Sequence, residues 1–495
     1  MNRSDFGRYG RRTVLSFLLY GTAGCALANA PERSSRPIGK PSDAAKRAVP
    51  DADRFIDAAK LGGKVSYVVA DARTGAVLES YAPLVAHPPA SVSKAVTALF
   101  ALEKLGPQHR YRTQIIADGP ISNGVLKGDL ILAGGGDPTL STDDLIEMAG
   151  RLKIAGLREV RGKLKVYGGA LPEIAEIDGS QPIQVGYNPG MSGLNLNFNR
   201  VYLEWKRGSA GYAITMDARS ERARPGVGFV RTQIADRATP IFTYSKGSDR
   251  ENWTVARKAL GKAGGRWLPV RYSTVYAGDV LQTVARSHGI KLSFPERSTR
   301  APKGQVLAEH LSPDLTKICR DMLKFSTNLT AEVVGLSASQ SSGLSGSGGA
   351  MSRWAEARYG VKKALFVDHS GLGDSTKLTA REMVRILSGP GAQARLQPIL
   401  KKVPARDAEN KVVENSPVRI VAKTGTLNFV SALAGYIRTP DGRDLAFAIF
   451  ASDLPRRRAL SKAQRERPKG SKSWNGRAKR LQNQLIRRWS VVHSS

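Results

Sequence analysis

A serine and a lysine three positions apart are the first residues of this chain that can do chemistry together. They occur in Pro89-Ala90-Ser91-Val92-Ser93-Lys94, at the predicted start of a helix that is expected to end at Gly106. Residues i and i+3 share a helix face, so the amine of Lys94 can take the proton of the Ser91 hydroxyl and activate it as a nucleophile. The alternative is a helix-capping serine followed by a surface lysine, and the pair alone does not decide between the two.

Two further motifs can complete such a site. Their residues are Ser326 and Asn328 in one motif, and Lys423, Thr424, Gly425 and Thr426 in the other. Ser-x-x-Lys, Ser-x-Asn and Lys-Thr-Gly, in this order, are the motifs of penicillin-binding proteins and class A β-lactamases. Separately, the second motif is also typical of a helix cap and the third of an exposed strand end. Together and in order, the three favour Ser91 as a nucleophile.

The segments around the motifs predict a sheet with helices against it. Alternation and turn residues predict strands at 65–69, 76–78, 418–426, 431–437 and 445–451. Helical patterns cover 308–336 and the C-terminal region, whose apolar stripe includes Leu481 and Trp489. The Ser/Gly-rich stretch 337–349 and the basic run 456–472 are predicted loops. The fold class is therefore α/β (α+β).

The span 107–290 has a different character, with many glycines and short predicted strands. Residues 192–202 alternate like a strand, and 142–154 have a helical pattern. The glycines at 134–136 lack the Lys-Ser/Thr ending and the βαβ setting of a phosphate-binding loop, so they predict a turn. We interpret the span as a separate, strand-rich unit.

Composition limits the functions that the chain can have. Its 495 residues, 41% of them apolar, suffice for two or three domains with a sizeable core. The net charge of +34 favours anionic surfaces, such as phospholipid heads or acidic wall polymers. No nucleic-acid partner is expected, because no zinc-finger, RNA-binding or basic-zipper pattern accompanies the charge. Cys25 and Cys319 exclude a disulfide framework, and the six histidines show no metal-ligand spacing.

The first 30 residues have the pattern of an export signal. Arg11 and Arg12 precede an apolar segment that ends in Ala28-Asn29-Ala30, an Ala-x-Ala cleavage pattern. The arginine pair favours the twin-arginine route, and hence the periplasm. A Sec signal and lipid attachment at Cys25, which leads to membrane association, are the alternatives. Residues 31–50, rich in Pro, Ser and basic residues, form the predicted linker.

The long separation between the first two motifs narrows the family. Ser326 follows Ser91 by 235 positions, too many for a compact β-lactamase. Other family patterns in the chain are Asp71…Thr74-Gly75, Gly136-Asp137-Pro138 and Asp368…Ser370-Gly371-Leu372. Over most of 60–455 the chain resembles the D-alanyl-D-alanine carboxypeptidase/endopeptidase family, the class C low-molecular-mass penicillin-binding proteins.

This resemblance implies a fold. It is a serine β-lactamase/transpeptidase-like sandwich, an antiparallel sheet flanked by helices, with a large strand-rich inserted domain. The DD-peptidase domain is then expected at 51–106 and 291–495, and the insertion at 107–290.

The resemblance also implies roles for the first two motifs. Ser91 attacks the carbonyl of the penultimate D-alanine of a peptidoglycan stem and forms an acyl-enzyme. Lys94 is the expected general base, with proton relay through Ser326. Asn328 orients the substrate amide and holds Lys94.

The third motif is expected to bind the substrate. Lys423 supplies a positive field, and the hydroxyls of Thr424 and Thr426 bind the terminal carboxylate. Gly425 lets the strand approach the substrate closely. The N–H groups of Ser91 and Thr426 form the oxyanion hole. The expected activity is that of a serine-type D-Ala-D-Ala carboxypeptidase, with DD-endopeptidase activity in addition, inhibited by β-lactams and needing no metal or organic cofactor.

Two departures from the family pattern leave alternatives open. Gly373 and Asp374 stand where the family tends to have Ser-Arg, and Gly168 where acidic residues are common in relatives. The alternatives are a β-lactamase and a catalytically impaired scaffold that binds peptidoglycan. Electrostatic association with an anionic wall or membrane surface is a further expectation.

Overall fold

The computed structural model describes residues 46, 48–373 and 375–494. The predicted export signal, nearly all of the predicted linker and Asp374 lie outside this part of the chain. From Val49 onward the chain forms one compact unit. Among the described residues, no helix has the length and apolar character needed to cross a membrane.

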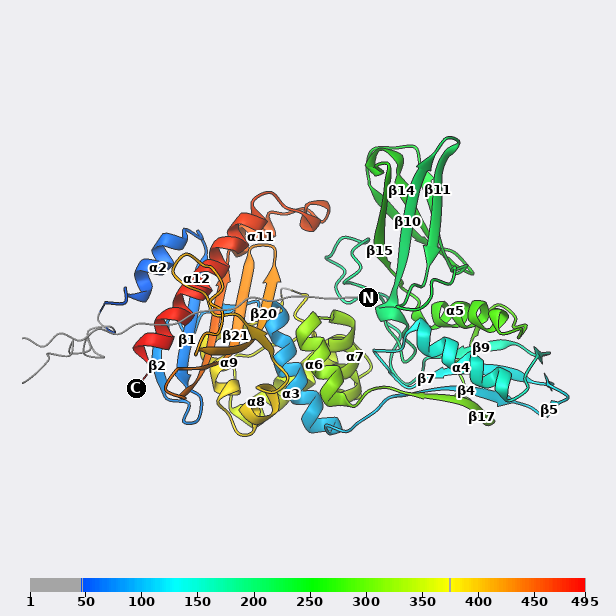
Figure 1. Cartoon of the computed structure of the whole chain (residues 1–495), viewed down its shortest axis with the longest axis horizontal. Helices are drawn as coiled ribbons and strands as arrows, with labels where there is room; N and C mark the ends of the chain where they lie inside the picture. Colours follow the sequence, from blue (N-terminus) through cyan, green and yellow to red (C-terminus); the bar gives the residue numbers. More distant parts are fainter. Residues whose placement is uncertain (1–45, 47, 374, 495) are drawn as a thin grey trace, which may run out of the picture. The chain divides into compact units, whose positions relative to one another are not determined.

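A six-stranded antiparallel sheet carries the third motif (Figure 1). In spatial order its strands are β19 (Lys401–Val403), β20 (Arg419–Leu427), β21 (Val430–Arg438), β22 (Asp444–Ser452), β1 (Lys64–Asp71) and β2 (Val77–Tyr81). β1 with β2 and β21 with β22 are the two expected hairpins, and β20 is the strand expected around Lys423. These predictions are confirmed.

Helices cover both faces of this sheet. Successive side chains of a strand point to opposite faces, so each strand contributes to two cores. In β1, Val68 packs with α3 (Ser93–Leu105), whereas Val69 packs with α2 (Ala52–Ala59) and α12 (Ser471–Val492). The other helices on the α3 side are α6 (Leu315–Phe325), α7 (Asn328–Ser339), α8 (Leu344–Tyr359), α9 (Ala380–Leu387) and α10 (Ala392–Leu396). The expected antiparallel sheet flanked by helices is thus present.

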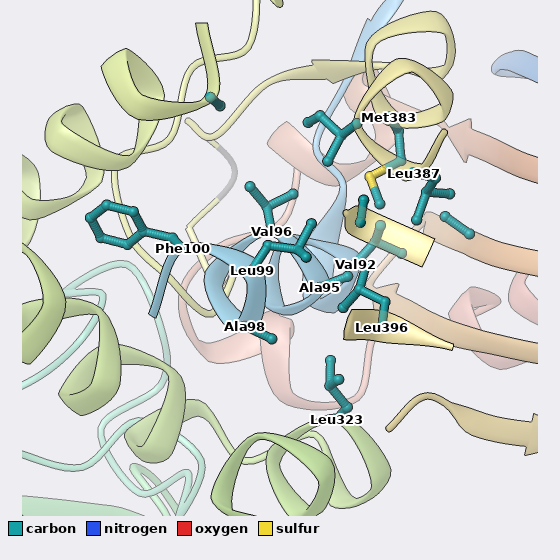
Figure 2. Close-up of a cluster of buried hydrophobic side chains, with 14 of the residues drawn as sticks. Val92, Ala95, Val96, Ala98, Leu99, Phe100, Leu323, Met383, Leu387 and Leu396 are labelled. Carbon is teal, nitrogen blue, oxygen red and sulfur yellow. The ribbon is translucent and has the colours of Figure 1, made fainter. Parts of the chain in front are cut away.

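The helix α3, which carries Lys94, is buried on nearly all sides. Figure 2 shows its apolar side chains beside Leu323 of α6, Met383 of α9 and Leu396 of α10. The helix ends at Leu105, and Gly106 follows with a φ of 86°, a conformation that glycine adopts readily. Because the core holds it from several directions, α3 fixes the position of Lys94 in the fold.

The segment between α3 and α6 is rich in strands, as expected. Its main sheet contains β16 (Glu296–Arg297), β9 (Leu164–Tyr167), β7 (Asp129–Gly134), β4 (Arg112–Asp118) and β17 (Gln305–Leu311). One smaller sheet consists of β11 (Gly211–Asp217), β10 (Arg200–Gly208) and β15 (Ala263–Pro269). A second consists of β12 (Val230–Ala235), β14 (Glu251–Ala256) and β13 (Phe242–Lys246). A third consists of β5 (Ile121–Ser122), β6 (Val125–Leu126) and β8 (Glu159–Val160). Two helices, α4 (Thr142–Ile154) and α5 (Ser273–Ser287), lie in the same segment, and β3 (Ala86–His87) pairs with β18 (Leu378–Thr379) elsewhere.

The limits of the insertion remain a prediction. β16 and β17 follow residue 290, yet they pair with β9 and β4 of the inserted segment. Residues 308–311 were expected to be helical, and this is wrong, because β17 pairs with β4 along their length. Long-range pairing overrides the local pattern here.

Three more local predictions need correction. Of the predicted strand 192–202, only the part from Arg200 onward belongs to β10. The Ser/Gly-rich stretch 337–349 is not one loop, because α8 begins at Leu344. There Gly348 packs so closely that a Cβ would lie 2.6 Å from the Phe366 carbonyl oxygen. The basic run 456–472 includes part of α11 (Leu454–Arg458), the 3₁₀ turn η4 (Ala463–Glu466) and the start of α12.

Candidate active site

Ser91 lies in the one-turn 3₁₀ helix η1 (Ala90–Val92), directly before α3. Lys94 follows in the first turn of α3, and its Nζ donates a hydrogen bond of 2.9 Å to Ser91 Oγ. Neither η1 nor α3 has a side-chain cap, so the structure does not support Ser91 as a helix-capping serine. A hydroxyl and an amine at this distance can exchange a proton.

The amine of Lys94 is fully buried and makes two further hydrogen bonds. Nζ donates to Asn328 Oδ1 at 2.8 Å and to the Ser370 carbonyl at 2.8 Å. Burial, and then the positive charge of Lys423, lower the pKa of Lys94 from 10.5 to about 7, against the opposing effect of nearby carboxylates. A large fraction of this amine is therefore neutral near pH 7, as a general base requires.

Ser326 and Asn328 lie at the junction of α6 and α7. Ser326 ends α6 in the left-handed conformation, with a φ of 60°, and Asn328 is the first residue of α7. Ser326 Oγ accepts a hydrogen bond of 3.0 Å from Lys423 Nζ, whereas Asn328 accepts from Lys94. The second motif therefore connects the lysines of the first and third motifs.

The third motif lies on β20 and passes close to the nucleophile. A Cβ on Gly425 would lie 2.6 Å from the Pro89 carbonyl oxygen and 3.1 Å from the Ser91 nitrogen, so only glycine fits. Lys423 is buried, and burial, followed by the charge of Lys401, lowers its pKa to about 8. The side chains of Thr424 and Thr426 are exposed. The strand thus passes beside Ser91 at Gly425 and exposes the hydroxyls of Thr424 and Thr426.

A buried carboxylate behind Lys94 was not among the predicted site residues. Glu332, one helical turn after Asn328, accepts hydrogen bonds from the N–H of Ser370 at 2.8 Å and of His369 at 2.9 Å. Burial and the nearby Asp368 raise the pKa of Glu332. Its position four residues after Asn328 on a helix is the one sequence signal that pointed to it.

The inserted segment also reaches the site. Asn328 Nδ2 donates a hydrogen bond of 2.9 Å to the backbone carbonyl of Tyr187. The Asn328 amide is thus held from both ends, with its oxygen toward Lys94 and its nitrogen toward Tyr187. A backbone carbonyl has no sequence signature, so the sequence could not reveal this contact.

A pocket of about 280 Å³ opens at Ser91. The predicted site residues that line it are Ser91, Ser326, Asn328 and Thr426, whereas Thr424 does not line it. Two other segments contribute to its walls. We call residues 175–188 of the inserted segment the roof loop, which supplies Gln181 and Tyr187, and residues 459–470 the strap, which supplies Arg465 and Glu466. The arrangement offers a nucleophile, a base and backbone donors around one cavity, which suits acyl transfer.

The two departures from the family pattern lie in different surroundings. Gly168 does not line the pocket, and a Cβ there would lie 3.0 Å from Ser192 Oγ. The N–H of Gly373 donates to Asp368 Oδ2 at 2.9 Å. Among the described residues, no three His, Cys, Asp or Glu side chains cluster as metal ligands do.

Comparisons with known proteins show what the chain is similar to. The model of the D-Ala-D-Ala carboxypeptidase 3 (S13) family matches residues 51–469. The chain is 28% identical to a D-alanyl-D-alanine carboxypeptidase of Actinomadura sp. (strain R39) over 439 residues, which cover 81% of this chain and 80% of the relative. It is 22% identical to the D-alanyl-D-alanine carboxypeptidase DacB of Haemophilus influenzae over 410 residues, which cover 79% of this chain and 85% of the relative.

A solved structure has the same fold. The crystal structure of penicillin binding protein 4 (dacB) from Haemophilus influenzae matches with a TM-score of 0.66 at 20% identity, covering 90% of this chain and 99% of the other. Another structure of that protein contains a bound β-lactam. The expected transpeptidase-like fold with an insertion is thereby confirmed.

Proposed function

Because this chain belongs to the D-Ala-D-Ala carboxypeptidase 3 (S13) family, we infer that it is a serine-type D-Ala-D-Ala carboxypeptidase, a hydrolase that acts on peptidoglycan stem peptides. One observation carries the mechanism. The buried amine of Lys94, with its pKa lowered to about 7, donates to Ser91 Oγ at 2.9 Å. A lysine in this state can accept the proton of the serine that it contacts.

In the acylation step, Ser91 Oγ attacks the carbonyl carbon of the penultimate D-alanine while its proton passes to Lys94 Nζ. The N–H groups of Ser91 and Thr426 hold the oxyanion that forms. The hydroxyls of Thr424 and Thr426 bind the terminal carboxylate, and the positive charge of Lys423 attracts this carboxylate. Gly425 lets β20 pass close to Ser91, so that the strand can place these groups around the reacting carbonyl.

The C–N bond then breaks, and the departing D-alanine takes a proton to become an amine. Ser326, which accepts a hydrogen bond from Lys423, relays this proton from Lys94. Asn328 orients the substrate amide and keeps Lys94 in place. Water attacks the acyl ester on Ser91 with Lys94 again as base, which frees the shortened stem and restores the serine.

β-Lactams are expected to acylate the same serine, because the strained ring presents a carbonyl in the position of the scissile amide. The Haemophilus influenzae relative has been solved with a β-lactam bound. For this chain we propose that Ser91 is the acylated residue, and that cross-linked stems are substrates too, which is DD-endopeptidase activity.

The test is covalent labelling with a fluorescent penicillin, followed by product analysis on a purified pentapeptide muropeptide. Persistent labelling, release of D-alanine, and loss of both in Ser91→Ala would support the proposal. Rapid loss of the label would indicate a β-lactamase instead. A well-folded protein that takes no label would leave the peptidoglycan-binding scaffold.

We also propose a location. The N-terminal segment has the features of an export signal of the twin-arginine type, which would deliver the enzyme to the periplasm. Immunoblots of periplasmic and cytoplasmic fractions, with Arg11→Lys and Arg12→Lys together as the export-deficient variant, test this. The net charge of +34 would favour association with anionic wall or membrane polymers. Salt should release the protein from purified sacculi in a pelleting experiment. Equal pelleting at low and high salt would contradict that association.

A further inference from the structure

The strap and the roof loop cover one particular side of the cleft at Ser91. In the proposed function, Thr424 binds the terminal carboxylate and Thr426 the reacting carbonyl. The residues that follow, Leu427 at the end of β20 and Asn428 in the turn after it, therefore lie beside the acyl part of the substrate. Both line the pocket together with the strap and the roof loop. The two segments thus face the acyl side, where the N-terminal part of a stem peptide must lie.

The cleft is small. Its volume is about 280 Å³, close to the lower end of the roughly 300–1,000 Å³ that ligand pockets usually measure. The roof loop is also tied to the catalytic residues, because the Tyr187 carbonyl accepts from Asn328. A long acyl group on this side of Ser91 therefore meets the strap and the roof loop.

Glu466 of the strap makes the main side-chain contacts that hold the segments together. Its carboxylate accepts a hydrogen bond of 2.7 Å from Arg266 Nη2, in the inserted segment, and one of 2.5 Å from Gln184 Nε2, in the roof loop. Two other side chains of the strap also donate to the roof loop, but to backbone carbonyls: Arg465 to that of Ser180 and Lys462 to that of Gly179.

The contacts of Glu466 are of a kind that can open. They are polar, and the side chains of Arg266 and Glu466 are 27% and 26% exposed, so water competes for both partners. The roof loop itself is held firmly from the other side. The guanidinium of Arg271 donates to the carbonyls of Ala175, Ile183 and Asn188. The weak point of the closed cleft is therefore the strap.

We propose that Glu466 is a specificity-determining residue, which clasps the strap to Arg266 and Gln184 and so restricts the size of the acyl group that reaches Ser91. The proposal rests on the proposed function. With the clasp closed, substrates with a small acyl group acylate Ser91 readily, and substrates with a large acyl group do so slowly. When the clasp opens, large acyl groups enter.

The experiment compares two penicillins that share the reacting ring. 6-Aminopenicillanic acid has no acyl group on its amine, whereas piperacillin has a bulky one. The second-order rate constant of acylation is measured for each, and the ratio of piperacillin to 6-aminopenicillanic acid is the readout. We expect Glu466→Gln and Arg266→Gln each to raise this ratio about two- to fivefold, the effect of losing one partly exposed ion pair.

Two further variants make the test specific. The exchanged pair, Arg266→Glu with Glu466→Arg, should bring the ratio back toward that of the wild type. Arg467→Gln is the matched control, because Arg467 is exposed on the same strap and lines a neighbouring pocket rather than the one at Ser91. It should leave the ratio unchanged.

Each other outcome contradicts the clasp. An unchanged ratio in both single variants shows that the contact does not limit access. A lowered ratio shows that the strap binds the acyl group instead of excluding it. An exchanged pair that stays at the ratio of the single variants excludes the ion pair as the cause. If neither penicillin acylates the wild type, the proposed function itself fails. Failure of the clasp alone is recognised because the wild type is still acylated while the ratio does not respond to the variants.

Discussion

Glu332 and Ser370 are joined by a hydrogen bond of 2.8 Å from the backbone N–H of Ser370 to Glu332 Oε1, and the carbonyl of Ser370 accepts from Lys94 Nζ. The carboxylate thereby acts on the catalytic amine through one residue. When Glu332 is ionised, its charge raises the pKa of Lys94 and so opposes the effect of burial.

We therefore expect Glu332→Gln to lower the pKa of Lys94 further and to move the pH profile of β-lactam acylation to lower pH. Stopped-flow acylation rates from mildly acidic to alkaline pH measure this. Glu382→Gln is the control, because Glu382 belongs to the capping box of α9. It should leave the profile in place and most of the stability intact, because Gln also serves at this position of a capping box. A profile that stays in place in Glu332→Gln would show that the carboxylate is only structural.

The wild type should also have a characteristic pH dependence. Only the neutral amine of Lys94 can take the proton of Ser91, and its pKa is about 7. The acylation rate is therefore expected to rise with pH through about 7 and then level off. Lys94→Arg retains a positive charge that does not titrate here, and it should reduce the rate by about 10²–10⁴-fold at every pH. A rate that is independent of pH across this region in the wild type would exclude Lys94 as the base.

The same lysine should make the enzyme less stable at neutral pH. Its folded pKa, about 7, lies below the ~10.4 of an unfolded lysine. Between these values the unfolded chain binds more protons, so stability rises with pH across this window, and below about 7 the full cost of burying the charge is present.

Lys94→Met removes this cost. We expect the variant to have a higher free energy of unfolding than the wild type at neutral pH, and the difference to shrink as the pH rises toward ~10. Urea unfolding at several pH values measures it. A variant that is less stable than the wild type at neutral pH would contradict the expectation.

Gly425 offers a prediction about the close approach of β20. In Gly425→Ala, the new Cβ would meet the Pro89 carbonyl oxygen at 2.6 Å, so β20 and η1 must separate. We expect acylation to fall about 10²-fold, because a displacement of this size misplaces the groups that hold the oxyanion. Gly476→Ala is the matched control. Gly476 lies within α12 with nothing within 4 Å, so this variant should gain about 0.5–1 kcal/mol of stability and keep its activity. Equal activity of the two variants would contradict the close approach.

The sequence was sufficient for the parts of the site that are fixed by local pattern. Ser91 and Lys94 lie one helical turn apart, and the hairpins of the sheet follow their alternation and turn residues. The order of the three motifs then identified the fold. In each case the information is contained in residues that are neighbours in the chain.

The rest depends on contacts between distant segments. The bond from Asn328 to Tyr187 joins a side chain to a backbone carbonyl, which any residue possesses. Residues 308–311 became a strand because β4 was available to pair with them. Position 348 of α8 holds a glycine because the backbone at Phe366 occupies the space that a side chain would fill. None of these partners can be read from the local sequence.

The pairing of β1 with β22 has a consequence for the order in which the chain can fold. Val68 pairs with Ala448, so the strand that precedes Ser91 has its neighbour in the sheet near the other end of the sequence. During synthesis from the N-terminus, the sheet under the active site cannot be completed until residue 452 has left the ribosome, whereas the sheets of the inserted segment are complete much earlier. During most of translation Lys94 therefore lacks Asn328 and Ser370, whose oxygens accept from its amine. The enzyme gains its reactivity only late in synthesis, when β22 is available.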